Sequence, residues 1–264
     1  MKFIDCSACI GRAAVNRLII NHEDYPVYEK VTQPKNFKEL LDEMDFCGVD
    51  EAVTWHNAMF DVAPTYGNKQ FLSEKGNYTG RLHGTITVLP SISDKGHTVE
   101  EIDETVKKYN LVGLRFFPKH NRFMLDAITC GDVLDYCIET GLPAYLSPMD
   151  DWEHIFAVMK EFPRLPVIIT NYGLWGSDRY FYPLVKAYPN VYVDTSDFQE
   201  IVGIEAFVNK FGSERMLFGT NYPCDNMGGP IAMLMGSRIS QEDKENIAHK
   251  NIERLFNGIG RSLK

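Results

Sequence analysis

The chain has 264 residues, of which 44% are hydrophobic and 24% charged, and its formal net charge is −9. This composition is typical of a globular protein with a sizeable core, and the acidic balance argues against a surface for nucleic acid or anionic membranes, since both need clustered Lys and Arg. No apolar stretch approaches the roughly 20 residues of a membrane-spanning helix, and no signal peptide is visible. We therefore predict a cytoplasmic protein whose six scattered cysteines stay reduced.

Short apolar segments alternate with longer amphipathic ones along the whole chain. The predicted strands are Phe3–Cys6, Glu51–Trp55, Leu82–Leu89, Val112–Phe117, Ala144–Ser147, Val167–Thr170, Val191–Asp194 and Met216–Gly219. Each is short and rich in Val, Ile, Leu or Phe, as strands covered on both faces are. Segments between them, such as Phe37–Met44 and Val133–Ile138, repeat apolar residues at helical spacing. Gly48, Gly113 and Gly141 fall where a helix would end, so we predict glycine caps there.

Eight strands interleaved with helices indicate parallel strands joined by right-handed crossovers, hence a closed barrel or a doubly wound sheet. Dividing 264 residues by eight leaves about 33 for each unit, close to the usual size of a barrel. No glycine-rich phosphate loop follows the first strand, which disfavours the doubly wound sheet. We therefore predict a single-domain (β/α)8 TIM barrel over residues 1–264, with Asn57–Gly80 as an irregular lid or rim loop on the catalytic face.

Four segments carry a resemblance to a known family. They are Phe3–Gly11, Gly141–Ser147, Val167–Gly173 and Arg215–Pro223, in that order along the chain. Together they resemble the decarboxylase-type branch of the amidohydrolase superfamily. The first strand of that family reads Ile-Asp-x-His-x-His-x-Gly, and its eighth reads Arg-x-Leu-Phe-Gly-[Ser/Thr]-Asp-x-Pro. The resemblance spans almost the whole chain and includes a closing helix like Asn246–Phe256.

The resemblance implies a divalent metal, but every residue that would hold it is replaced. Family members bind the metal with two His of the first strand, one His each from the fifth and sixth strands, and an Asp from the eighth. The matching residues here are Ser7, Cys9, Ser147, Asn171 and Asn221. Serine hydroxyls and asparagine amides are weak neutral ligands, and one cysteine does not hold a metal alone. We therefore predict no metal and no other cofactor, and no metal-activated water.

The remaining candidates each have a functional and a structural interpretation. Arg115, on the fourth predicted strand, suits capture of a substrate carboxylate or phosphate, or forms a salt bridge to a neighbouring strand. His56 is a candidate acid, base or hydrogen-bond donor, or an ordinary loop histidine. Cys9 is a candidate nucleophile if a base such as His56 deprotonates its thiol; otherwise it is an unreactive buried residue. Tyr172 and Trp175 wall a pocket against a ring or acyl group, or pack.

The leading hypothesis is a hydrolase or lyase that acts on a small carboxylated substrate without the metal of the family. The expected catalytic residues are His56, Cys9 and Asn221. The expected substrate-binding residues are Arg115, Ser7, Ser147, Asn171, Tyr172 and Trp175. One alternative is a catalytically inactive barrel that binds a small ligand or a protein partner, and another is a metal-dependent hydrolase with atypical ligands. The resemblance also makes a homodimer one option.

Overall fold

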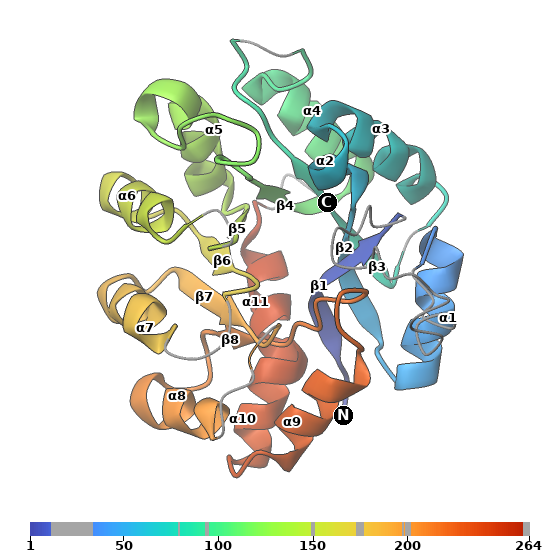
Figure 1. Cartoon of the computed structure of the whole chain (residues 1–264), viewed down its shortest axis with the longest axis vertical. Helices are drawn as coiled ribbons and strands as arrows, with labels where there is room; N and C mark the ends of the chain where they lie inside the picture. The colour runs from blue at the N-terminus through green and yellow to red at the C-terminus, as the bar shows by residue number, and fades with distance from the viewer. Residues whose placement is uncertain are drawn as a thin grey trace, which may run out of the picture.

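The computed structural model describes residues 1–11, 34–78, 80–92, 95–148, 151–172, 177–196, 198 and 202–260. In them, eight parallel strands form one sheet whose spatial order is the order of the sequence, and the helices surround the strands (Figure 1). The strands are β1 (Ile4–Ile10), β2 (Glu51–His56), β3 (Leu82–Thr87), β4 (Leu111–Arg115), β5 (Ala144–Leu146), β6 (Val167–Ile169), β7 (Val191–Asp194) and β8 (Met216–Leu217). The predicted (β/α)8 barrel is confirmed.

Helices follow the strands in sequence and pack against their outer faces. They are α1 (Phe37–Cys47), α2 (Ala58–Asp61), α3 (Pro64–Lys75), α4 (Val99–Tyr109), α5 (Ala127–Thr140), α6 (Glu153–Glu161), α7 (Asp178–Ala187), α8 (Gly203–Phe211), α9 (Gly228–Gly236), α10 (Gln241–Glu245), the π-helix η2 (Asn246–Lys250) and α11 (Asn251–Gly258). Within the described ranges, none of these helices has the length and apolar character needed to cross a membrane.

The seam of the barrel lies between β1 and the chain around β8. The Cys6 N–H donates to the Phe218 carbonyl at 2.8 Å, and the Cys9 N–H donates to the Tyr222 carbonyl at 2.8 Å. These two bonds continue the ladder beyond the end of β8. The sheet therefore closes on itself although β8 is only two residues long.

Asp5 adds a side-chain link across this seam. Its carboxyl group accepts hydrogen bonds from the Thr220 N–H at 3.0 Å, from the Thr220 hydroxyl, and from the Ser7 N–H at 2.9 Å. Asp5 is fully buried, so these donors stand in for water. One polar residue inside an apolar strand thus joins positions 215 residues apart in the sequence.

Two of the three predicted glycine caps are confirmed and one is wrong. Gly48 and Gly141 end α1 and α5 in the left-handed conformation, with φ of 78° and 71°. Gly113 instead lies inside β4, because α4 already ends at Asn110, which has a φ of 50°. A Cβ on Gly113 would lie 2.4 Å from the ring of Tyr145, so glycine is needed there for the close approach of that ring.

The prediction of an irregular connection over residues 57–80 is also wrong, because α2 and α3 occupy most of it. The apolar residues of α3 do not form a continuous stripe, so its periodicity does not indicate a helix. Three other features hold α3 in place. Pro64 begins the helix, where its missing N–H costs nothing, and Gly67 packs against α2. The Asn68 side chain bonds both the N–H of Thr87, at 3.0 Å, and its carbonyl, at 2.7 Å.

We expect Gly67→Ala to destabilise the protein by roughly 2–3 kcal/mol through overpacking. A Cβ at position 67 would lie 2.2 Å from the backbone nitrogen of Met59, so α2 and α3 would have to separate. Gly131→Ala in α5 is the matched control, because the nearest atom to its added Cβ is Ala127 Cβ at 3.8 Å. We expect the control to be neutral or to stabilise by up to about 1 kcal/mol. Urea unfolding measures both, and equal effects would contradict the packing argument.

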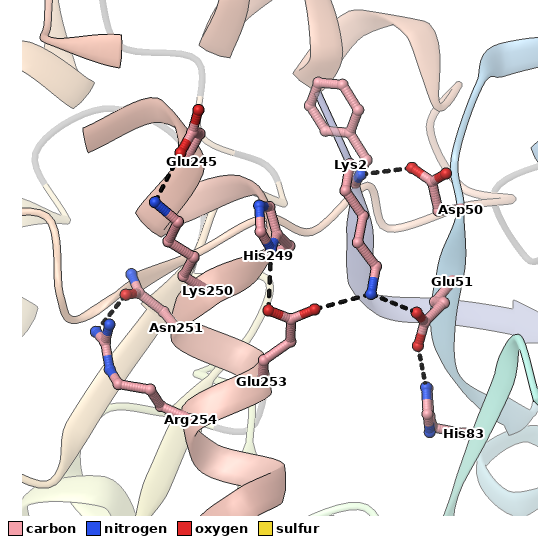
Figure 2. A network of polar contacts seen from close by, with 11 residues as sticks. Lys2, Asp50, Glu51, His83, Glu245, His249, Lys250, Asn251, Glu253 and Arg254 are labelled. Atoms are coloured by element: carbon pink, nitrogen blue, oxygen red, sulfur yellow. Dashed lines mark hydrogen bonds and ion pairs between the residues drawn. The ribbon is translucent and has the colours of Figure 1, made fainter. Parts of the chain in front are cut away.

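An ion-pair network ties the amino-terminal end of the barrel together (Figure 2). Lys2 bridges Glu51 of β2, at 2.6 Å, and Glu253 of α11, at 2.8 Å. Each glutamate is also bound by a histidine, His83 at 2.7 Å from Glu51 and His249 at 3.0 Å from Glu253. This network lies at the end of the barrel opposite the carboxyl ends of the strands, where residues serve stability. His83 therefore has a structural role at this end of the barrel.

Candidate functional site

Arg115 is the last residue of β4 and lies inside the barrel, with only 3% of its surface exposed. Its Nε donates to the Thr85 hydroxyl at 2.9 Å. The guanidinium carbon lies 5.0 Å from the ring centroid of Trp55 and 4.6 Å from that of Tyr145. Both rings therefore stabilise the cation through their π faces. The carboxyl end of a barrel strand is where such a residue meets a substrate.

The guanidinium of Arg115 has no ion pair in the part of the chain that the structure describes. No carboxylate oxygen there lies within 4.0 Å of its nitrogen atoms, so a salt bridge to a neighbouring strand is not formed in these ranges. Its Nη2 is buried and has no hydrogen-bond partner among the residues that the structure describes. Burial lowers the pKa of Arg115, but arginine remains protonated at any physiological pH. The barrel thus contains a cation with an open donor.

A buried carboxyl group, that of Asp194 at the end of β7, lies close to this cation. The pKa of Asp194 is raised to about 8, chiefly by burial; the hydrogen bond with Ser196 opposes this rise, and the nearby Asp5 carboxyl adds to it. The Cys6 thiol lies 3.6 Å from Asp194 Oδ2. Asp194 therefore keeps its proton at neutral pH and is no counter-charge for Arg115.

Ser196 joins Asp194 to Asn171, which follows β6. The Ser196 hydroxyl oxygen lies 2.5 Å from Asp194 Oδ1 and 2.8 Å from Asn171 Oδ1, and it accepts the Asn171 N–H at 3.1 Å. A hydroxyl has one hydrogen, so Ser196 can donate to only one of the two oxygens. When Asp194 is protonated, it donates to Ser196, and Ser196 donates to Asn171. This order leaves the NH2 group of Asn171 available to another partner.

The side-chain amide of Asn221, which follows β8, is held through its NH2 group, whereas that of Asn171 is held through its oxygen. Its Nδ2 donates to Asp225 Oδ2 at 2.9 Å, and the carboxylate partner determines which side of the amide faces it. The Asn221 oxygen is therefore the atom left to accept. Asn171 and Asn221 both have positive φ, 53° and 55°, a conformation in which asparagine is enriched. The ends of β6 and β8 thus carry one amide donor and one amide acceptor.

Ser7 and Cys9 are buried within β1, and Ser147 is buried directly after β5. Ser7 is anchored through its N–H, which donates to Asp5 at 2.9 Å. The Cys9 thiol donates to the Ile10 carbonyl at 3.3 Å, and burial raises its pKa well above the ordinary value. Cys9 is therefore a neutral thiol at physiological pH, and thiolate attack needs an additional cationic neighbour.

His56 ends β2 and is half-buried. Its Nδ1 accepts the Ala58 N–H at 3.1 Å, so the neutral ring carries its proton on Nε2. The ring packs on Gly11, where a Cβ would lie 2.4 Å from Cε1. Burial lowers the pKa of His56, which favours this neutral donor form. Among the described contacts, none joins His56 to Cys9.

Tyr172 is buried against two phenylalanines, with ring centroids 4.8 Å from Phe181 and 5.7 Å from Phe198. Its ring is thus part of the core behind the strand ends. Trp175 lies outside the described residues.

The sequence matches the family model described as amidohydrolase over residues 20–258. The chain belongs to the amidohydrolase family. No curated protein matches it. Solved structures show the same fold. They include an uncharacterized TIM-barrel protein from Bordetella bronchiseptica, with 19% identity, a TM-score of 0.71 and coverage of 99% of this chain and 100% of that one.

Two decarboxylases share this fold. One is 5-carboxyvanillate decarboxylase from Sphingomonas paucimobilis, with 17% identity, a TM-score of 0.70 and coverage of 97% of this chain and 99% of that one. The other is 2,6-dihydroxybenzoate decarboxylase from Rhizobium, with 14% identity, a TM-score of 0.69 and the same coverages of 97% and 99%. At these identities the likeness shows the fold of the amidohydrolase family, and the site has to be argued from its own residues.

In this chain, the residues at the positions of the family's metal ligands do not fit a divalent metal. Zinc and related metals take imidazole, thiolate or carboxylate ligands, and usually three or more from the protein. The matching positions here offer hydroxyls, amides and a protonated thiol. In the described ranges, no group of three or more His, Cys, Asp or Glu side chains is placed to hold a metal ion.

Several residues of the site are not predicted from the sequence. They are Asp5, Trp55, Thr87 and Tyr145, which lie on strands of the barrel. A usable signal is present, because polar residues at alternate positions, such as Thr85 and Thr87, lie on one face of a strand. Whether that face is the barrel interior depends on closure of the sheet.

Proposed function

We propose that this member of the amidohydrolase family is a hydrolase or lyase that acts on a small carboxylated molecule without the metal of its family. The observation that carries the proposal is the buried Arg115 guanidinium, which has an open Nη2 and no carboxylate within 4.0 Å among the described residues. A buried cation needs an anionic partner, and a substrate carboxylate supplies one.

In this proposal Arg115 holds the carboxylate, while the end of the barrel orients the reacting carbonyl. Asn171 offers an NH2 group and Asn221 an oxygen. Ser7 contributes a hydroxyl from β1, and Ser147 contributes one from the end of β5. The neutral ring of His56 or the proton of an aspartic acid serves in proton transfer. Cys9 as a nucleophile, and Tyr172 and Trp175 as substrate-binding residues, stay predictions.

A line of aromatic rings supports an aromatic substrate. From Arg115 it runs through Trp55 to Phe117, with centroids 5.7 Å apart, and then to Phe60 at 5.0 Å. Phe60 stacks on His120 at 3.8 Å. Such rings suit a flat ring next to a carboxylate. Two structural neighbours, decarboxylases of 5-carboxyvanillate and 2,6-dihydroxybenzoate, act on acids of this class.

A ligand-binding barrel without turnover is the second candidate. It is favoured by the protonated thiol of Cys9 and the neutral ring of His56, which leave no activated nucleophile at these two residues. A homodimer and a cytoplasmic location also stay predictions.

The decisive experiment compares carboxylate binding in the wild type and in Arg115→Met. We expect 2,6-dihydroxybenzoate or 5-carboxyvanillate to raise the Tm of the wild type, and the variant to bind about 10- to 100-fold more weakly, the usual value of a hydrogen bond to a charged group. Arg164→Met is the matched control, since Arg164 is exposed. An equal rise in Tm in all three proteins would show that Arg115 does not bind the carboxylate. Product formation with a bound acid separates the enzyme from the ligand-binding barrel.

A further inference from the structure

Three buried polar atoms that have no hydrogen-bond partner among the described residues lie on three adjacent strands. They are Thr87 Oγ1 at the end of β3, Arg115 Nη2 at the end of β4, and the Tyr145 hydroxyl oxygen in β5. In the sheet register Thr87 pairs with Arg115, and Arg115 pairs with Tyr145. Residues paired in this way in parallel strands point to the same face of the sheet. The three open atoms therefore belong to one row inside the barrel.

Other polar groups of the same residues are bonded. The backbone of Thr87 is satisfied by Asn68 at 2.7 and 3.0 Å, and Arg115 Nε is bonded to Thr85 at 2.9 Å. The three open atoms are therefore not the result of a poorly formed strand. The large majority of buried side-chain polar atoms in proteins have a hydrogen-bond partner, so three such atoms without one in the same row call for an explanation.

The chemistry of the row identifies what it can bind. The guanidinium can only donate, and both hydroxyls can donate to an acceptor. A group with several lone pairs and a negative charge satisfies all three atoms at once, which describes a carboxylate. Gly113 contributes as well, because its missing Cβ lets the Tyr145 ring lie against β4, 4.6 Å from the guanidinium.

We propose that Thr87 and Tyr145 complete a three-donor site with Arg115, in which both hydroxyls and Arg115 Nη2 bind one carboxylate group inside the barrel. This inference rests on the proposed function for the choice of a carboxylate, and it assigns two further specificity-determining residues. A site of this kind lowers the stability of the ligand-free protein, because its donors are buried without acceptors. Removing a hydroxyl is therefore expected to help the empty protein and to harm the complex.

The test uses Tyr145→Phe and Thr87→Val, which remove one hydroxyl each and keep the shape. We expect the Tm of the ligand-free protein to stay level or rise, and Kd for formate to increase about tenfold in each variant. Formate is the probe because it is the smallest carboxylate, and chloride at equal ionic strength is the reference. Two matched controls have satisfied hydroxyls: Tyr136→Phe, bonded to Asp103 at 3.1 Å, and Thr54→Val, bonded to the His83 carbonyl at 2.7 Å.

The controls should lower the Tm and leave formate binding unchanged. If Tyr145→Phe and Thr87→Val lower the ligand-free Tm as the controls do, the hydroxyls are already satisfied in the empty protein and the inference is overturned. It is also overturned if formate does not raise the Tm of the wild type above that in chloride. If formate binds as expected but no carboxylic acid that binds is converted to product, the three-donor site stands and the proposed enzymatic function fails.

Discussion

Asp5→Ala is expected to lower the free energy of unfolding by about 3–5 kcal/mol, one of the largest effects of a single substitution in this chain. The variant removes the acceptor of two backbone N–H groups, those of Ser7 and Thr220, and of the Thr220 hydroxyl. All three donors are buried and would be left without a partner. The loss falls on the seam between β1 and β8, where the barrel closes.

Asp5→Asn is the matched control for this substitution. Its amide oxygen can still accept both N–H groups, and its NH2 group can donate to the Thr220 hydroxyl. We therefore expect a loss of less than about 1 kcal/mol, measured by urea unfolding beside the alanine variant. Equal losses in the two variants would show that charge, and not the number of acceptors, stabilises the seam.

The second large expected effect is a pH dependence of the free energy of unfolding, which is caused by Asp194. Burial raises the pKa of this carboxyl from 3.8 to about 8. Between these values the native state keeps a proton that the unfolded state releases. Stability therefore falls as pH rises through this window, by up to about 1.4 kcal/mol for each pH unit, and levels off above the folded pKa.

Asp194→Asn removes this titration. Relative to the wild type, the variant should gain stability steadily between pH 5 and pH 8, whatever its effect at pH 5. Urea unfolding at pH 5, 6.5 and 8 measures the difference, with Asp225→Asn as a control for the loss of one carboxyl group. Parallel profiles for Asp194→Asn and wild type would mean that the carboxyl is already ionised in the native state. The proposed orientation of Asn171 through Ser196 would then be reversed.

The strands, α3 and Gly113 show which parts of the fold can be predicted from the sequence. The alternation of apolar and amphipathic segments predicts all eight strands of the barrel, because the strands are short apolar runs covered on both faces. It does not predict α3, whose burial depends on the contact between Gly67 and α2 rather than on a stripe of apolar residues. Gly113 is misassigned for a similar reason, since a ring from the next strand, and not a helix end, requires glycine there.

The amino-acid sequence alone thus predicts the order of the strands and the resemblance to the family. It also predicts the replacement of the family's ligands by Ser7, Cys9, Ser147, Asn171 and Asn221, and Arg115 as the candidate anion site. These are properties of local patterns and residue identity. The partners of each side chain emerge from the folded barrel. Arg115 faces two rings, while Asp5 bonds Thr220 across 215 residues. The physical reason is that hydrophobic periodicity is local, whereas the partner of a buried polar group depends on which distant strands lie side by side.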